Sequence, residues 1–191
     1  MDANLKFNLH TQRVVKKLSK FVPILYKLKK FLEVKYLRML YFSLVFPHLI
    51  YCTSAWGGSC KKVIKPVHIL QKGIVRAING ADRRAHTREL FLSLNFMNFE
   101  QIVHYVTCTY VYRALHNPAI SCFVYESHQR RTRRADMELL SVPFTSLECC
   151  RRNILYRGPN NFNSLPFNVR NASNYDCFKA RLKKTVFESV L

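Results

Sequence analysis

The chain has 191 residues and carries 31 Lys or Arg against 11 Asp or Glu, a formal net charge of +20. Its length suits one domain, or one domain with an appendage, and an apolar content of 49% excludes a wholly disordered chain. The charge excess favours a polyanionic partner, most often nucleic acid. The alternatives are a basic surface without a partner and a basic arm on a membrane-associated protein.

The positive charge is unevenly distributed. Residues 1–76 hold 15 basic and 2 acidic residues, and most of the basic ones are Lys. Residues 77–191 hold 16 basic and 9 acidic residues, and most of the basic ones are Arg. Lys is a hydrated point charge, whereas Arg is a bidentate fork. The first part therefore predicts a face that binds phosphates without reading sequence, and the second a mixture of phosphate contacts and internal ion pairs.

Residues 5–31 predict one long amphipathic helix or two short ones, because apolar residues recur there at three- and four-residue steps. Pro23 lies inside the pattern and is expected to bend or split the helix. The polar face is filled with Lys and has no Glu partners four residues on. The apolar residues of the pattern are Val14, Val15, Leu18, Phe21, Val22, Leu25, Leu28 and Leu32, and the basic residues of the polar face include Lys16, Lys17, Lys20, Lys27 and Lys30.

Residues 36–57 form the most apolar stretch of the chain, without a charged residue from Met39 to Trp56. Such a segment is either the central helix of a core, packed on several faces, or a membrane span. We favour the core, because Pro47 should interrupt the helix and the polar side chains would need partners inside lipid. The stretch is also near the minimum length for a span, and no secretory signal precedes it.

Residues 63–79 predict the clearest amphipathic helix, with Lys72 and Arg76 off its apolar stripe and Asn79-Gly80 as its end. The stripe consists of Val63, Val67, Leu70, Ile74 and Ile78. A short helix is expected over 87–94. Asn98 is expected to cap a further helix over 99–116, which ends at Asn117-Pro118.

The remainder is less regular. The run 129–134 is basic and is expected to be a solvated loop. Residues 139–157 alternate weakly and predict one or two short strands, and 158–166 predict a turn-rich loop. Ser173 is expected to open a last helix that buries Phe178, Leu182 and Val186.

Motifs for catalysis are not found. The 11 carboxylates are scattered, although metal-assisted phosphoryl transfer needs them clustered. The sequence contains no phosphate-binding loop, dinucleotide fingerprint or nucleophile elbow. The seven Cys form no C-x-x-C motif, so we expect reduced thiols, an intracellular location, no metal and no cofactor. We interpret His86 as structural and expect no enzymatic activity from this chain alone.

Several segments, in order, resemble one family. Residues 17–20, 24–28, 40–52, 56–57, 69–78 and 84–87, then Leu90, Phe91 and Leu94, and the box Tyr156 to Pro166 resemble the region that follows the palm in jockey-type non-LTR retrotransposon reverse transcriptases. The final pieces, Phe178-Lys179 and Leu182 to Lys184, are similar to that family's closing helix. Phe162 stands where Trp is more usual. The palm with its Asp-Asp dipeptide and the endonuclease have no counterpart here, so the resemblance implies a fragment covering the thumb and C-terminal region.

Together these observations predict a mainly α fold: a helical thumb-like bundle over 1–118, a basic loop over 119–137 and a small mixed α/β appendage over 138–191. The resemblance implies sequence-independent binding of an RNA–DNA or DNA duplex and no small-molecule substrate. The expected phosphate contacts are Lys16, Lys17, Lys20, Lys27, Lys30, Lys72 and Arg76. Trp56, His48 and Asn163 are interpreted as a core anchor, a buried polar group and a turn former. The alternatives are a basic protein anchored in a membrane by residues 36–57 and a helical protein-interaction module.

Overall fold

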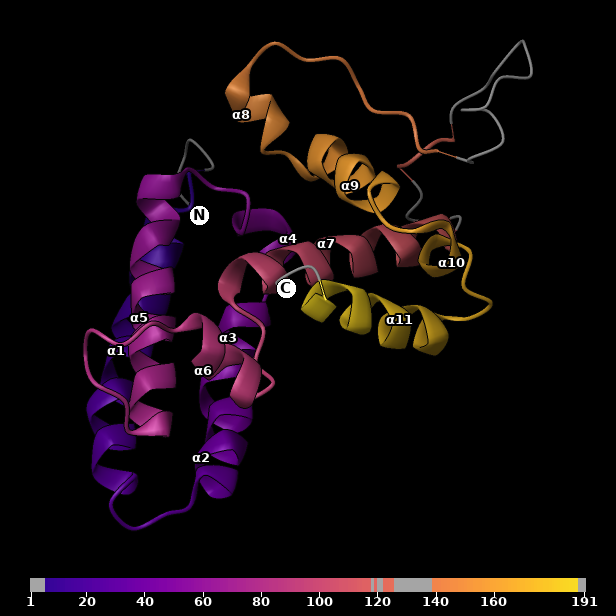
Figure 1. Cartoon of the computed structure of the whole chain (residues 1–191). Helices are drawn as coiled ribbons and strands as arrows, with labels where there is room; N and C mark the ends of the chain where they lie inside the picture. Colours follow the sequence, from indigo (N-terminus) through magenta and orange to yellow (C-terminus); the bar gives the residue numbers. More distant parts are fainter. Residues whose placement is uncertain (1–5, 118, 120–121, 126–138, 189–191) are drawn as a thin grey trace. The chain divides into compact units, whose positions relative to one another are not determined.

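The computed structural model describes residues 6–117, 119, 122–125 and 139–188 (Figure 1). The prediction of a mainly α fold is confirmed, since helices dominate these residues and their only β pairing is an isolated bridge between Tyr125 and Leu140. The chain divides into two compact units, Met1–Ile102 and Val103–Leu191. The predicted basic loop lies mostly outside the described residues, and the division at 118 and 137 stays a prediction.

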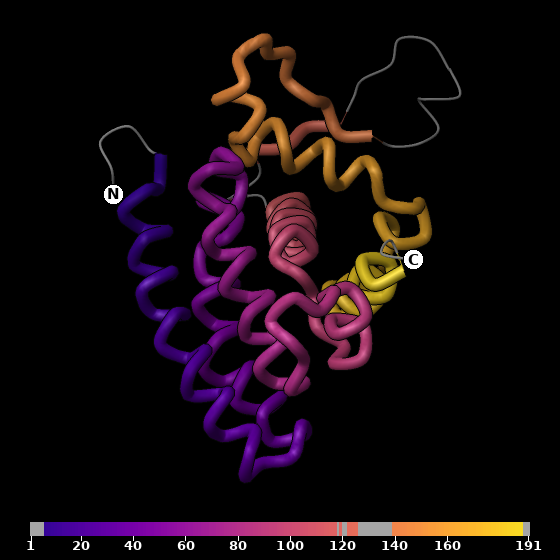
Figure 2. The backbone as a smooth tube through the Cα atoms, turned by 60° about the vertical axis from the view of Figure 1, so that its left-hand side comes forward, coloured from indigo at the N-terminus to yellow at the C-terminus, as the bar shows by residue number. Residues whose placement is uncertain are grey.

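The first unit is built around α1, α5 and the connected helices between them. Figure 2 shows α1 and α5 side by side along most of their length, and this pair makes the most extensive contact between elements. The elements are α1 (Asn8–Leu28), α2 (Val34–Leu40), the π-helical turn η1 (Tyr41–Val45), α3 (Phe46–Ile50), α4 (Thr53–Trp56), α5 (Lys61–Asn79), α6 (Arg88–Ser93) and the first turn of α7 (Phe99–Leu115).

Helix α1 is a single helix that includes Pro23, so the proline does not split it. Its buried side chains, Thr11, Val14, Leu18 and Leu25, lie on one face and agree with the predicted apolar pattern. The helix ends at Leu28, and a tight turn leads to α2.

The prediction that residues 36–57 are packed on several faces is wrong. Burial follows a single stripe at four-residue steps: Leu37, Tyr41, Val45, Leu49, Thr53 and, further on, Trp56. Met39 is 62% exposed and Phe42 41% exposed. The physical reason is that the segment lies on one side of the bundle, so only one face meets α1 and α5. No described helix is both long enough and apolar enough to cross a bilayer.

Pro47 interrupts regular helical geometry, as predicted. The π-helical turn lies directly before it, and the Phe46 amide donates to the Tyr41 carbonyl five residues back. A π-helical turn is wider than an α-helical one, so residues four apart stay closer to one face through it. This explains how a four-residue repeat remains on the buried side from Leu37 to Leu49.

Trp56 is the core anchor that the sequence predicted, at 1% exposure. Its indole N–H donates to the Tyr51 carbonyl at 2.8 Å, and its ring stacks on Phe99 with centroids 5.2 Å apart. His48 is only half-buried, with its ring stacked beside Phe21, so the prediction of a buried polar group is wrong.

Helix α5 contains one buried polar residue that the sequence analysis missed. The Gln71 side chain is 1% exposed, and its amide nitrogen donates to the Tyr41 hydroxyl at 3.0 Å and to the Met97 carbonyl at 2.9 Å. The Tyr41 ring stacks on Phe96 at 4.0 Å. Gln71 therefore connects three segments of the unit through one buried and one partly buried hydrogen bond.

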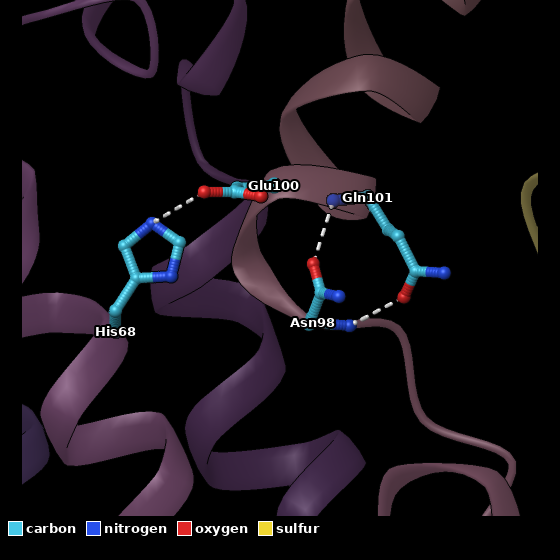
Figure 3. A network of polar contacts seen from close by, with 4 residues as sticks. All are labelled: His68, Asn98, Glu100 and Gln101. Carbon is cyan, nitrogen blue, oxygen red and sulfur yellow. Dashed lines mark hydrogen bonds and ion pairs between the residues drawn. The ribbon is translucent and has the colours of Figure 1, made fainter. Parts of the chain in front are cut away.

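Helices α6 and α7 begin close to where they were predicted. Asn98 caps α7 reciprocally with Gln101: the Asn98 Oδ1 accepts from the Gln101 amide at 3.0 Å, and the Gln101 Oε1 accepts from the Asn98 amide at 2.8 Å (Figure 3). This is a capping box, which satisfies two amides that a helix start otherwise leaves without partners.

The second unit contains the rest of α7, then α8 (Glu148–Arg151), α9 (Ile154–Asn163), α10 (Phe167–Arg170) and α11 (Tyr175–Glu188). The predicted strands over 139–157 and the predicted loop over 158–166 are therefore wrong. Two thirds of the loop segment belongs to α9, which begins where the Asn153 side chain accepts from the Leu155 amide at 3.0 Å. The C-terminal unit is helical rather than mixed in its described residues.

Gly158 and Asn163 have packing roles rather than turn roles. A Cβ at Gly158 would lie 2.9 Å from Val111 Cγ2 and 3.2 Å from the Phe123 ring, so glycine permits close approach of α9. The Asn163 side chain accepts from the Leu140 amide and donates to its carbonyl, both at 2.9 Å. Asn163 thus pairs with both backbone groups of Leu140, as a residue of a neighbouring strand would, which corrects its interpretation as a turn former.

Helix α11 confirms the predicted burial of Phe178, Leu182 and Val186. Its cap is Asn174, whose Oδ1 accepts from the Cys177 amide at 2.8 Å, rather than Ser173. The Phe178 ring stacks on Tyr112 of α7 at 4.1 Å, and the Tyr112 hydroxyl donates to the Ala172 carbonyl at 2.9 Å.

Candidate nucleic-acid interface

The outer face of α1 is a row of basic side chains. Placed at 100° per residue, Arg13, Lys16, Lys20 and Lys27 fall within about 60° of one another and opposite the buried face of the helix. All four are exposed. We call these four residues the α1 ridge. From Arg13 to Lys27 the ridge spans about 21 Å of helix axis, at 1.5 Å per residue.

Among the residues that the structure describes, no carboxylate pairs with the α1 ridge. Within residues 6–117 and the other described segments, none of its side chains forms an ion pair, and Glu33 is the sole carboxylate of the sequence between Asp2 and Asp82. The pairs 13–16, 13–17, 16–20 and 17–20 are instead like charges one turn apart, each unfavourable by about 0.2–0.5 kcal/mol. The ridge thus presents positive charge that the fold itself does not use.

The two other basic residues proposed near α1 are also exposed. Lys17 lies beside the ridge, and Lys30 lies in the turn after the helix. Lys29 differs from both, because it is half-buried and its aliphatic chain lies 3.2 Å from the position that a Cβ on Gly80 would occupy. This contact brings the ends of α1 and α5 together and shows that the two helices run in the same direction.

Lys72 and Arg76 both lie on α5 but differ in exposure and in hydrogen bonding. Lys72 is exposed, as are Lys61 and Lys65 on the same helix, which the sequence analysis did not select. Arg76 is half-buried, and its Nε donates to the Ala85 carbonyl at 3.0 Å. Arg76 therefore holds the segment after α5 in place. The signal that would have found Arg13, Lys61 and Lys65 is their position off the apolar stripes.

Two histidines lie close to these cations. Burial lowers the pKa of His10 on α1, and the charges of Arg13 and Lys17 lower it further. Burial also lowers the pKa of His68 on α5, against the opposing effect of Glu100, whose carboxylate lies 4.0 Å away (Figure 3). The Glu100 side chain is 84% exposed, so water screens this ion pair and burial dominates.

Other chemistry is limited in the described part of the chain. It contains no group of three His, Cys, Asp or Glu side chains arranged to hold a metal ion. All seven cysteines are present as thiols, and burial raises the pKa of Cys108 far above its ordinary value, which disfavours a reactive thiolate. The arginines of 129–134 lie outside the described residues.

Comparison with known proteins gives no relative: no family model, no curated protein and no solved structure matches this chain.

Proposed function

We propose that this chain binds the phosphate backbone of an RNA–DNA or DNA duplex without reading its sequence, through the α1 ridge and the exposed lysines of α5. The observation that carries the proposal is the ridge itself: four exposed cations on one line, without carboxylate partners in the described part of the chain. Lys-rich faces of this kind neutralise phosphates and contain no groups arranged to read base edges.

The proposal extends to the origin of the chain. We infer a fragment of a non-LTR retrotransposon reverse transcriptase that corresponds to the thumb and C-terminal region, without catalytic activity of its own. Its support is the ordered series of resembling segments and the helical bundle with basic outer faces. Sequencing the genomic DNA upstream tests it: an Asp-Asp palm in any reading frame supports this origin, and an unrelated coding sequence joined in frame contradicts it.

The binding proposal is tested by the salt dependence of affinity for a duplex of about 20 base pairs. Each phosphate contact adds about −0.9 to the slope of log K against log salt, so several contacts predict a slope steeper than about −3. The Lys16→Gln/Lys20→Gln variant should reduce the steepness by about 1.8, since two contacts are lost. Gln has nearly the helix propensity of Lys, so α1 should remain folded.

A matched control keeps the total charge equal. Lys183 and Lys184 are exposed on α11, and replacing both by Gln removes the same two charges elsewhere. We expect the control to leave the slope within experimental error of the wild-type value. Two duplexes of unrelated sequence should bind equally. Equal slopes for the two double variants would show that net charge, rather than the ridge, drives binding.

A further inference from the structure

The turn between α1 and α2 presents an aromatic ring to solvent on a well-defined backbone. Phe31 is 83% exposed, and Tyr36, at the start of α2, is 49% exposed. The turn is held by hydrogen bonds from the Lys30 amide to the Lys27 carbonyl at 3.2 Å and from the Phe31 and Leu32 amides to the Leu28 carbonyl at 3.0 and 2.8 Å. Exposure of Phe31 is therefore a feature of an ordered turn.

Lysines flank Phe31 on both sides along the chain. Lys30 immediately precedes Phe31, Lys27 lies one turn earlier and Lys35 follows, and all three are exposed. Glu33 is the single carboxylate of the turn, and its place directly before α2 suits the positive end of that helix. An aromatic ring among lysines is the combination that binds single-stranded nucleic acid, with stacking on the base and neutralisation of the phosphates.

The position of the turn relative to the α1 ridge suggests what part of a nucleic acid reaches it. The ridge spans about 21 Å, which matches about six base pairs at 3.4 Å each. Phe31 lies three residues beyond the last residue of α1, at the Lys27 end of the ridge. A strand that follows the ridge therefore meets the ring where the contacted duplex ends.

We propose that Phe31, assisted by Tyr36, stacks on an unpaired base next to the duplex that the α1 ridge holds, so that the chain prefers a duplex with a single-stranded overhang to a blunt duplex. This inference rests on the proposed function. A membrane surface also attracts aromatic and basic residues. It would account for the exposed Phe31 and the lysines of the turn but not for the α1 ridge, because the ridge extends along the helix away from the turn.

The test compares the full-length chain with its Phe31→Ala variant on two probes, a blunt duplex and the same duplex with a four-nucleotide overhang. We expect wild type to bind the overhang probe more tightly. Phe31→Ala should lose about fivefold to a hundredfold affinity for that probe, the usual range for one stacked base, and little for the blunt duplex. Phe31→Trp should retain the preference, and Phe31→Leu, apolar but without a π face, should lose it.

A control variant separates a local effect from a general loss of aromatic surface. Phe144→Ala removes a ring that is 99% exposed in the second unit and should leave both affinities unchanged. Salt-dependent binding of both probes with no effect of Phe31→Ala overturns the stacking inference and leaves the proposed function intact. Failure of wild type to bind either probe overturns the proposed function as well. If Phe31→Ala loses binding to phosphatidylserine vesicles but keeps its affinity for both nucleic-acid probes, Phe31 contacts a membrane and the stacking inference is refuted.

Discussion

Two glycines in helix interiors should respond oppositely to the same substitution, Gly→Ala. At Gly73 in α5, a Cβ would meet no atom within 4 Å, so alanine should stabilise the helix by about 0.5–1 kcal/mol. At Gly158 in α9, the Cβ would lie 2.9 Å from Val111 Cγ2 and 3.3 Å or less from two atoms of the Phe123 ring. Neither neighbour is the end of a flexible chain, and overpacking of this kind costs about 1–3 kcal/mol. After subtraction of the propensity gain, Gly158→Ala should destabilise by up to about 2 kcal/mol.

Urea denaturation measures both effects, with one signal from the first unit alone and one from the helices of both units. Trp56, the single tryptophan, is buried in the first unit, so its fluorescence reports the free energy of unfolding around Gly73. Far-UV circular dichroism follows the second unit as well. The reasoning is refuted if Gly158→Ala is as stabilising as Gly73→Ala, because the close approach of α9 to Val111 and Phe123 would then not exist.

Two further predictions concern buried polar groups. Gln71→Met should lower the free energy of unfolding by about 1–3 kcal/mol, because the Tyr41 hydroxyl and the Met97 carbonyl lose their donor. The loss should be smaller in a Tyr41→Phe background. Additive effects in this double-mutant cycle, measured by urea denaturation, would argue against the hydrogen bond. The pKa values of His10 and His68 are lowered from 6.5, so the unfolded chain binds more protons as pH falls below about 6.5 and the free energy of unfolding should decrease there. His68→Gln should weaken this pH dependence between pH 7.5 and 5.5, and an unchanged profile would show that burial of His68 has no effect on folding.

The apolar periodicity predicted the helices that have one buried face. Val14, Leu18 and Leu25 on α1, and Phe178, Leu182 and Val186 on α11, are buried as expected, because burial of an apolar stripe is what makes such helices stable. The same logic misled the interpretation of 36–57. A stretch without charges was expected to be buried on all sides, but apolar residues are common on surfaces, and Met39 and Phe42 are exposed.

The C-terminal errors share a cause. Gly, Pro and Asn are turn formers by local propensity, so 158–166 was predicted to be a loop. In the structure, close packing against Val111 and Phe123 leaves no room for a side chain at Gly158, and Asn163 makes two hydrogen bonds to the backbone of Leu140. Contacts between residues more than 20 positions apart cannot be read from local pattern. Gln71 was missed for the same reason, since its partners come from Tyr41 and Met97.

The exposure of the basic side chains could be predicted better than the core, because exposure of a charged residue depends little on distant contacts. A lysine opposite an apolar stripe is exposed whenever the stripe is buried, and this held for Lys16, Lys20 and Lys27. Arg76 is the instructive exception. Its guanidinium donates to Ala85, a residue of the segment after α5, which no helical pattern anticipates.

The basic residues of α1 are not explained by the stability of the fold. Burial of Val14, Leu18 and Leu25 stabilises the helix. The ridge on the opposite face adds repulsion between like charges, and no ion pair with a described residue offsets it. Glu at alternate positions of that face would give favourable pairs at the same exposure, so stability alone favours a mixed face. Because the apolar and basic patterns occupy opposite sides of the same helix, the apolar side specifies packing while the basic side stays exposed and available for the phosphate contacts proposed above. Because the basic face is not explained by folding stability, the ridge supports a proposed function more directly than the bundle does.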